Sequence, residues 1–249
     1  MPTYYNEWSP YPAQWLRNLF PDADVDDRDI RDVGVGDVSP YDRVHLFAGI
    51  GGWEYALRLA DWPETEPVWT GSCPCQPFSR CGRKAGNKDE RHLWPEMLRL
   101  IAGNRPPVVF GEQVAGRSGI EWFDGVRADL EAIGYTCGMA VLPAACVGAP
   151  HNRERIFWVA NASWPARDGT VVRRDARPHG GVTGQEWGDY YPYPCSDGKV
   201  RRVGRGVQPL DARIPNDLDR LLAYGNSIVP QVAAVFIRAY IEARWSAAS

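Results

Sequence analysis

The sequence contains no apolar run of roughly 18 residues, the length that a membrane-spanning helix requires. Its 249 residues also include no internal repeat and no low-complexity tract. The opening MPTYYNEWSP lacks the basic and then apolar layout of a secretory signal. These absences argue against a helical membrane protein and a repeat array, and we expect a soluble, cytoplasmic protein with no membrane partner.

Paired CxxC motifs are also missing, although the chain has six cysteines. Without that spacing, the sequence predicts neither a disulfide framework nor a familiar zinc module. We expect free thiols, as is usual in a reducing compartment. One alternative is a zinc site built from Cys73, Cys75, Cys81 and His92, but this spacing fits no common zinc pattern and we predict no metal.

A large excess of positive charge is absent too, because 28 Lys and Arg residues face 31 Asp and Glu residues, for a net charge of −3. The whole molecule is therefore not a basic nucleic-acid binder. The charge is uneven, however: residues 1–45 are rich in aspartate, whereas residues 161–213 lean basic. Local sign matters more than total charge for binding a polyanion, so the basic segment is a candidate nucleic-acid surface.

Strand-like and helix-like patterns alternate up to residue 160. RVHLFAG, PPVVFGE and RERIFWVA are typical of buried strands, whereas GGWEYALRLA, ERHLWPEMLRLIA and IEWFDGVRADLEAIG are typical of helices. This alternation favours an α/β fold with a mostly parallel, twisted sheet. We expect one main domain formed by residues 1–160 and 214–249, and a small irregular region of loops and short strands at residues 161–213.

Cys75 lies in SCPCQPFS, directly after the strand-like PVWTG. Ligands of open α/β sheets bind at the carboxyl ends of strands, so a thiol held there between prolines is a candidate nucleophile. The alternative is a buried structural cysteine, although a turn flanked by prolines is an unusual way to build a core.

Several short motifs, in order, resemble those of the DNA cytosine-5 methyltransferases. FAGIGG is similar to the first motif, PCQPFS to the fourth, and YGNSIVPQVAAVF to the last. DERHLW resembles the fifth motif with His92 in place of the more common Gly, and GEQV has Gln113 where the family usually has Asn. APHNRERIFWVA resembles the eighth motif, with His151 at the position of the usual Gln. The resemblance implies a Rossmann-like S-adenosylmethionine-dependent methyltransferase fold with helices on both faces of the sheet.

The family's second and third motifs are missing from their usual place between FAGIGG and PCQPFS. The N-terminal TYYNEWSP resembles the second motif, and DVDDRDIRDV resembles the third. We therefore hypothesise a circularly permuted member, in which strands two and three precede strand one, because termini are rejoined most easily at exposed loops. The alternative is an acidic N-terminal extension on a truncated core that binds no cofactor.

The resemblance also implies roles for individual residues. Cys75 would bond transiently to C6 of cytosine, Glu112 would protonate N3, and Arg153 and Arg155 would approach the cytosine O2 or a nearby phosphate. The loop after Cys75 is expected to contact DNA through Gln76, Ser79, Arg80, Arg83 and Lys84. S-adenosylmethionine is the implied cofactor, and its expected contacts are Glu7, Trp8, Asp29, Ile30, Phe47, Ala48, Gly49, Ile50, Gly51, Gly52, Pro74, Leu93, Asn226 and Ser227.

Double-stranded DNA is the implied partner, and the target base would have to leave the stack to be modified. Residues 161–213 would then form the target-recognition region. Two alternatives stay open: an RNA cytosine-5 methyltransferase that uses the aromatic run EWGDYYPYP, and a non-catalytic DNA-binding module of the same fold. We expect a monomer from a bacterium or a phage. No code links such loops to bases, so no recognition sequence is predicted.

Overall fold

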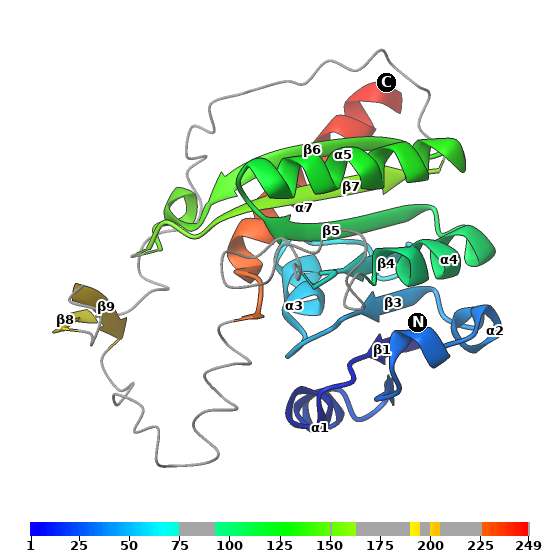
Figure 1. The fold of residues 1–249 in the computed structure, drawn as a ribbon, viewed down its shortest axis with the longest axis horizontal. Coiled ribbons are helices and arrows are strands. Elements are labelled where there is room, and N and C mark those ends of the chain that lie inside the picture. Colours follow the sequence, from blue (N-terminus) through cyan, green and yellow to red (C-terminus); the bar gives the residue numbers. More distant parts are fainter. Residues whose placement is uncertain (75–92, 150, 163–189, 195–199, 205–225, 249) are drawn as a thin grey trace.

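The computed structural model describes residues 1–74, 93–149, 151–162, 190–194, 200–204 and 226–248. Its main element is a seven-stranded sheet with the order β2-β1-β3-β4-β5-β7-β6 (Figure 1). In that order the strands span Asp24–Asp26, Thr3–Asn6, Arg43–Leu46, Val68–Gly71, Val108–Val114, Glu154–Asn161 and Thr136–Pro143. Neighbouring strands are parallel except at β7, which is antiparallel to both β5 and β6. The expected mostly parallel sheet is confirmed.

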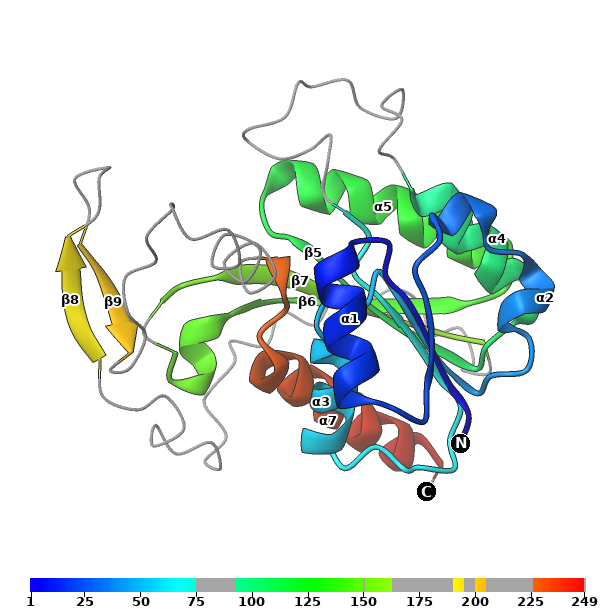
Figure 2. The same cartoon turned by 90° about the horizontal axis from the view of Figure 1, so that it is seen from below.

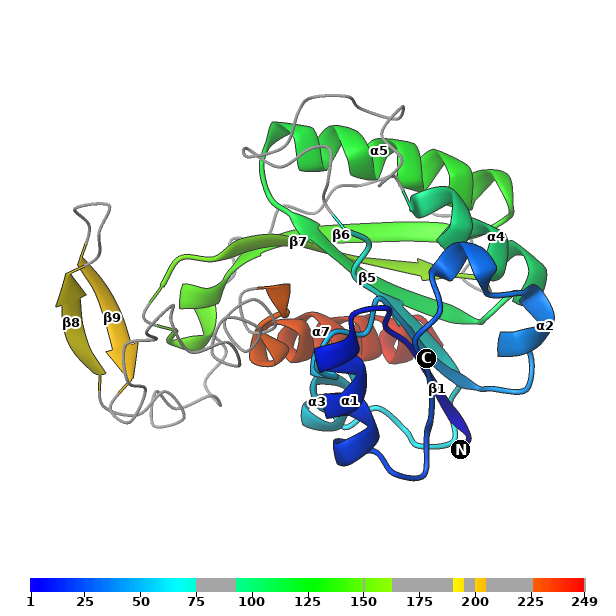
Figure 3. The ribbon, with the colours of Figure 1, turned by 60° about the horizontal axis from the view of Figure 1, so that its bottom comes forward.

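Helices cover both faces of this sheet, as expected (Figure 3). One face carries α1 (Pro10–Leu19), α3 (Gly52–Leu59) and α7 (Pro230–Ala248). The other face carries α2 (Val35–Val38), α4 (Trp94–Asn104) and α5 (Arg117–Ala132). Two 3-10 turns, η1 (Ile30–Asp32) and η3 (Ala144–Val147), lie in the connections. None of the helices in the described ranges is long and apolar enough to cross a membrane.

Alternation along the buried strands divides the core into two halves. On β5, Val108 and Phe110 pack with α3 and α7, whereas Val109 packs with α4 and α5. Glu112 continues the first set, so its side chain belongs to the face that carries α3. On the other face, a Cβ at Gly111 would lie 2.1 Å from the ring of Trp158, so only glycine fits there.

The N-terminal strands are an integral part of the sheet. β1 pairs in parallel with β2 on one side and with β3 on the other. The chain therefore runs outward from β1 to β2, returns through residues 27–42 to β3, and then continues in the opposite direction to β4 and β5. The carboxyl ends of β1, β3, β4 and β5 meet at one edge, where open α/β sheets bind ligands.

One connection between parallel strands has an unusual hand. From β1 to β2 the chain moves one way across the sheet with α1 on one face, and from β4 to β5 it moves the other way with α4 on the opposite face. These two connections have the same hand. From β3 to β4 the chain also moves toward β5, but α3 lies on the face of α1. That connection therefore has the opposite hand to the other two, a feature that is rare because about 98% of such connections are right-handed.

A buried ionic cluster fastens α3 to the sheet. Glu54 of α3 contacts Arg43 of β3 at 3.4 Å and His45 of β3 at 3.3 Å. His45 also shares a hydrogen bond of 2.8 Å with Thr70 of β4. Burial opposes the charge on Glu54, but its contacts with His45 and Arg43 lower the pKa of this carboxyl to about 2. The Glu54 carboxylate is therefore charged, and its contacts with Arg43 and His45 hold α3 against β3.

Two features differ from the sequence-based expectations. β6 was not predicted, because TCGMAVLP has no clear alternation: it is an edge strand that pairs only with β7. The predicted helix ERHLWPEMLRLIA begins at Trp94 in the described residues, with Leu93 as its N-cap. Within the expected irregular region, β8 (Tyr190–Pro194) and β9 (Val200–Gly204) form a separate antiparallel pair (Figure 2).

Candidate functional site

The FAGIGG segment forms the turn between β3 and α3. Phe47, Gly49 and Gly51 have positive φ angles of 53°, 56° and 84°. Glycine adopts such angles readily, whereas Phe47 does so at an energetic cost, which is typical of functional turns. A Cβ at Gly51 would also lie 2.8 Å from the ring of Phe20. The turn points the unpaired backbone N–H groups of the first turn of α3 at the ligand-binding edge, where an anionic group is favoured.

Glu7 connects the N-terminal tract with this turn. Its Oε2 accepts a hydrogen bond of 2.8 Å from the backbone N–H of Gly49, and its Oε1 accepts one of 2.9 Å from that of Ser9. Burial raises the pKa of Glu7. The neighbouring Trp8 is 71% exposed. The Asn-Glu-Trp tract therefore lies against the glycine turn, with a carboxylate and an exposed indole at the same edge of the sheet.

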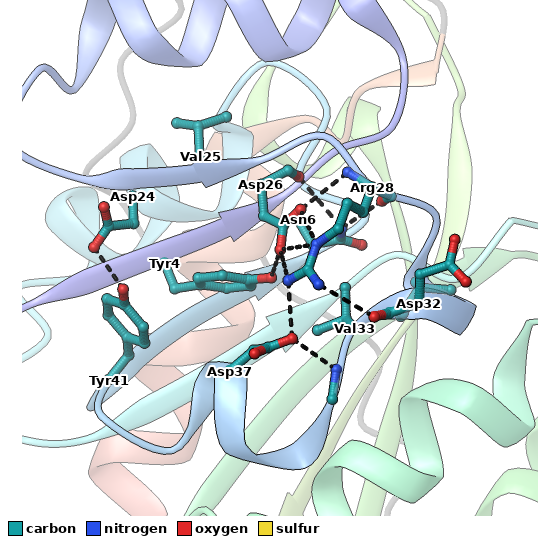
Figure 4. A network of polar contacts seen from close by, with 12 residues as sticks. Tyr4, Asn6, Asp24, Val25, Asp26, Arg28, Asp32, Val33, Asp37 and Tyr41 are labelled. Carbon is teal, nitrogen blue, oxygen red and sulfur yellow. Dashed lines mark hydrogen bonds and ion pairs between the residues drawn. The ribbon is translucent and has the colours of Figure 1, made fainter.

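A polar network holds the loop that follows β2 (Figure 4). The carboxylate of Asp26 accepts hydrogen bonds of 2.6 Å from the Tyr4 hydroxyl and from the Arg28 guanidinium. Arg28 also contacts Asp37 at 2.8 Å. Burial opposes the charge on Asp26, but its hydrogen bonds with Arg28 and Tyr4 lower the pKa of this carboxyl to about 2. The network fixes the path of the chain toward two of the residues expected to contact the cofactor.

Those two residues, Asp29 and Ile30, begin the η1 turn. The Asp29 carboxylate caps η1 by accepting from the Arg31 N–H at 2.9 Å and also pairs with the Arg31 guanidinium at 2.6 Å. Ile30 is 2% exposed and packs in the core beneath the loop. In this structure both side chains are thus engaged within the protein.

Glu112 lies inside β5, two residues before the strand ends, whereas PPVVFGE placed it at the last position of the expected strand. The reason is that β5 keeps pairing with β7 as far as Val114 and Arg155. The Glu112 carboxylate contacts Nε of Arg155 at 2.7 Å and accepts a hydrogen bond from Ser72. Burial raises the pKa of Glu112, although the nearby charges of Arg155 and Arg153 oppose the shift. Burial thus favours the protonated form of this carboxyl, which is the form that a general acid uses.

The two arginines of the eighth motif have different contacts. Arg155 belongs to β7 and holds Glu112, whereas Arg153 precedes β7, which begins at Glu154. Nη2 of Arg153 donates a hydrogen bond of 3.1 Å to the backbone carbonyl of Ser227. Arg153 therefore connects the sheet edge with the C-terminal segment that enters α7.

That C-terminal segment also reaches the glycine turn. Ile228 packs so closely that a Cβ at Gly52 would lie 2.9 Å from its Cγ1. Asn226 is exposed and Ser227 is half-buried beside this contact. The structure thus brings the first and last motifs together, although they are about 175 residues apart in the chain.

The segment after β4 is described only as far as Pro74, which is exposed. Gln113 is 2% exposed, and its Nε2 donates to the backbone carbonyl of Cys73 at 3.4 Å. Leu93, at the other end of the gap, is half-buried against the core. Gln113 therefore supports the start of the loop that follows β4. It does so with a side chain one methylene longer than that of the Asn usual at this position.

The predicted nucleophile and DNA-contacting residues lie outside the described residues. Among the described residues, no group of three or more His, Cys, Asp or Glu side chains could hold a metal ion. The predicted positions outside the described part of the chain are Cys75, Gln76, Ser79, Arg80, Arg83 and Lys84. Cys81 and His92 of the zinc alternative also lie outside it.

Sequence reasoning missed two residues at this edge. Nε1 of Trp53, the second residue of α3, donates a hydrogen bond of 3.0 Å to Oγ of Ser72. Both adjoin recognised motifs: Trp53 follows FAGIGG and Ser72 precedes the Pro-Cys segment. Adjacency was the only signal available, because neither residue type suggests a role by itself.

Comparison with known proteins gives a consistent result. M.AplI, a Type II methyltransferase from Arthrospira platensis, is 33% identical over 124 residues, which cover 48% of this chain and 35% of that protein. M.CviJI, a Type II methyltransferase from Paramecium bursaria Chlorella virus IL3A, is 29% identical over 164 residues, covering 60% of this chain and 41% of that protein. The chain thus spans well under half the length of these curated relatives.

Among solved structures, a DNMT2 mutant from Spodoptera frugiperda aligns with a TM-score of 0.49 and 16% sequence identity, over 71% of this chain and 49% of that one. The family model described as C-5 cytosine-specific DNA methylase matches residues 61–166. That range includes the Pro-Cys segment, Glu112 and both arginines of the eighth motif. Residues 61–166 of this chain are thus similar to the C-5 cytosine-specific DNA methylase family.

Proposed function

We propose that this chain is a DNA cytosine-5 methyltransferase that transfers a methyl group from S-adenosylmethionine to C5 of an extruded cytosine. The observation that carries the proposal is the buried Glu112 carboxyl, which lies at the same edge of the sheet as the glycine turn and the Pro-Cys segment. A buried carboxyl with a raised pKa, on the strand next to the one that leads into the Pro-Cys segment, suits proton transfer to a pyrimidine ring.

The residues at the glycine turn fit the proposed cofactor. The turn between β3 and α3 presents backbone N–H groups to a carboxylate, and Glu7 keeps lone pairs available for ribose hydroxyls beyond its two backbone bonds. Trp8 offers an exposed ring for stacking on adenine. When bound, S-adenosylmethionine would supply an electrophilic methyl group. Asn226 and Ser227 would close the pocket from the C-terminal segment.

The proposed chemistry uses residues from three strand ends. The Cys75 thiolate adds to C6 of cytosine, and Glu112 gives a proton to N3 so that the ring does not accumulate negative charge. C5 then acts as the nucleophile toward the methyl group. Loss of the C5 proton to a base, release of the Cys75 thiolate and return of the N3 proton to the Glu112 carboxylate then restore the neutral aromatic ring. Arg155 orients the Glu112 carboxyl through the 2.7 Å contact.

Double-stranded DNA is the proposed partner. A cytosine within a duplex cannot present its ring faces to a thiolate and a methyl donor at once, so the base must leave the stack. We assign DNA contacts to the loop after Cys75 and target recognition to residues 161–213, with residues 1–160 and 214–249 as the catalytic domain. A monomeric enzyme of a bacterium or a phage is part of the same proposal.

The circular permutation is also a proposal, and the hand of the β3–α3–β4 connection supports it. If the chain ran from α3 to β1 instead of β4, it would cross the sheet toward β2 with α3 on its present face. That path has the same hand as the β1–α1–β2 and β4–α4–β5 connections. The first five strands would then have the Rossmann order 3-2-1-4-5, with β3, β1 and β2 as the first three strands. The unusual connection is the expected result of cutting the chain after α3 and rejoining it to β4.

A transfer assay tests the proposed activity. The protein is incubated with methyl-labelled S-adenosylmethionine and either duplex DNA or RNA of mixed sequence, and the nucleosides are separated after digestion. We expect label in 5-methylcytosine from DNA. Label in RNA alone would favour the RNA alternative, and cofactor binding without transfer to either polymer would favour a non-catalytic module.

Replacement of Glu7 by glutamine is expected to weaken binding of S-adenosylmethionine by roughly 10- to 100-fold, because a charged acceptor for ribose hydroxyls is lost. Isothermal titration calorimetry on the full chain measures the effect. The exposed Glu121→Gln variant is the matched control, since that side chain pairs only with a surface arginine on α5. Equal affinity in Glu7→Gln and the control would favour an N-terminal segment unrelated to the cofactor.

A further inference from the structure

Ser72 lies directly between the glycine turn and Glu112. It follows β4, which ends at Gly71, and so stands at the ligand-binding edge of the sheet. Its Oγ accepts the hydrogen bond of 3.0 Å from Nε1 of Trp53 and contacts the Glu112 carboxylate. Trp53 is 2% exposed and comes immediately after Gly52. The three side chains form a partly buried chain of hydrogen bonds from α3 to β5.

The direction of these bonds follows from the chemistry of the groups. An indole N–H can only donate, so Ser72 must accept from Trp53. A serine hydroxyl has one proton, and an ionised carboxylate can only accept. When Glu112 is ionised, the Ser72 proton is therefore directed at its carboxylate. Because the indole holds the oxygen in place, the hydroxyl keeps this direction rather than rotating among alternative partners.

We propose that Ser72 is a positioning residue for Glu112. Its hydroxyl, anchored by Trp53, donates to an oxygen of the Glu112 carboxyl group and governs how readily that group takes up and releases its proton. The catalytic role of Ser72 rests on the proposed function, in which the proton of Glu112 is delivered to N3 of cytosine. The hydrogen bond stabilises the ionised form, and it thereby offsets part of the effect of burial.

The other charged groups that act on Glu112 come from the β7 side. Arg155 touches the carboxylate at 2.7 Å, and Arg153 acts from just before the strand. Both favour the ionised form, as Ser72 does, while burial favours the protonated form. Ser72 is the uncharged member of this set, so its replacement changes the hydrogen bonding of Glu112 without changing the net charge of the site.

The test is a direct titration of Glu112 in the free protein. Carboxyl carbons of glutamate are labelled with ¹³C, the Glu112 signal is assigned by its loss in Glu112→Gln, and its midpoint is followed with pH by NMR. In Ser72→Ala we expect the midpoint to rise by about one pH unit, because a donor to the charged form is lost. Ser72→Thr, which keeps the hydroxyl, should restore the original midpoint.

Two further variants show whether the effect is specific. Trp53→Phe keeps the Ser72 hydroxyl but removes its anchor, so we expect a smaller rise in the same direction. Ser39→Ala removes a hydroxyl at the far end of α2, where it contacts only the carbonyl of Gly36, and should leave the midpoint unchanged. An unchanged midpoint in folded Ser72→Ala, or failure of threonine to restore it, would overturn the inference.

Activity provides an independent second reading. If Glu112 is the acid, the alkaline limb of the pH profile of kcat/KM, which reports the free enzyme, should move upward in Ser72→Ala by the same amount as the NMR midpoint. A moved midpoint in a protein that transfers no methyl group would contradict the proposed function but support the role of Ser72. An activity profile like that of the original protein, together with an unmoved NMR midpoint, would contradict the role of Ser72 but support the proposed function.

Discussion

Replacing Cys75 by serine is expected to abolish methyl transfer, with a loss of at least about 1,000-fold in kcat. Covalent activation of C6 needs a good nucleophile, and a serine hydroxyl is almost entirely protonated at neutral pH, whereas a thiol supplies a reactive thiolate. Cofactor affinity should stay unchanged, because Cys75 is not among the expected contacts of the cofactor. Transfer rates under single-turnover conditions and calorimetric affinities separate the two effects.

The covalent step itself can be trapped. DNA that carries 5-fluorocytosine has no C5 proton to lose, so the adduct with the enzyme persists and is seen as a shifted band after denaturing electrophoresis. Cys75→Ser should give no such band. Cys73→Ala is the matched control two positions away, because the Cys73 side chain is 4% exposed and packs in the core. Full-rate transfer by Cys75→Ser, or loss of the adduct only in the Cys73 variant, would refute the assignment.

Glu112→Gln should have the second largest effect, a fall in kcat of about 100- to 10,000-fold, which is the usual contribution of a positioned general acid. Glutamine has nearly the same shape and can still accept from Arg155 and Ser72, so the site should keep its structure. Its amide cannot deliver a proton to N3. Single-turnover rates measure the loss, and Glu121→Gln should keep the original rate.

The pH dependence of methyl transfer should differ in a definite direction between the original protein and Glu112→Gln. Glu112 acts as an acid in its protonated form, and burial raises its pKa, so the active form persists to higher pH than for an ordinary carboxyl. Activity should therefore decline as pH rises through the Glu112 pKa, and Glu112→Gln should lack this alkaline limb. A variant that retains both the rate and the limb would show that another group supplies the proton.

Local sequence patterns determined which segments become the central elements. RVHLFAG, PPVVFGE and RERIFWVA became β3, β5 and β7, because short buried apolar runs bounded by turn residues are recognisable without any partner. The glycine turn was equally recognisable from the sequence, since Gly49 and Gly51 take positive φ angles that most other residues avoid. The family motifs were read from the same contiguous stretches.

Edge strands and strand hand depended on the assembled sheet. β6 has little apolar alternation and is held mainly by its pairing with β7, which no local pattern reveals. The unusual hand of the β3–α3–β4 connection follows from which neighbours the strands choose, not from the residues of α3. Both features arise from hydrogen bonds between segments that are far apart in the chain.

The sequence by itself determined the candidate chemistry of this protein: a thiol in a Pro-Cys turn, a carboxyl near a strand end, and a glycine turn. Only the tertiary structure decided that Glu7 reaches Gly49, and that Glu112 is held by Ser72 and Arg155. The physical reason is distance along the chain. Each of these contacts joins residues about 40 positions apart, and whether two such side chains meet depends on strand order, register and the face toward which each points.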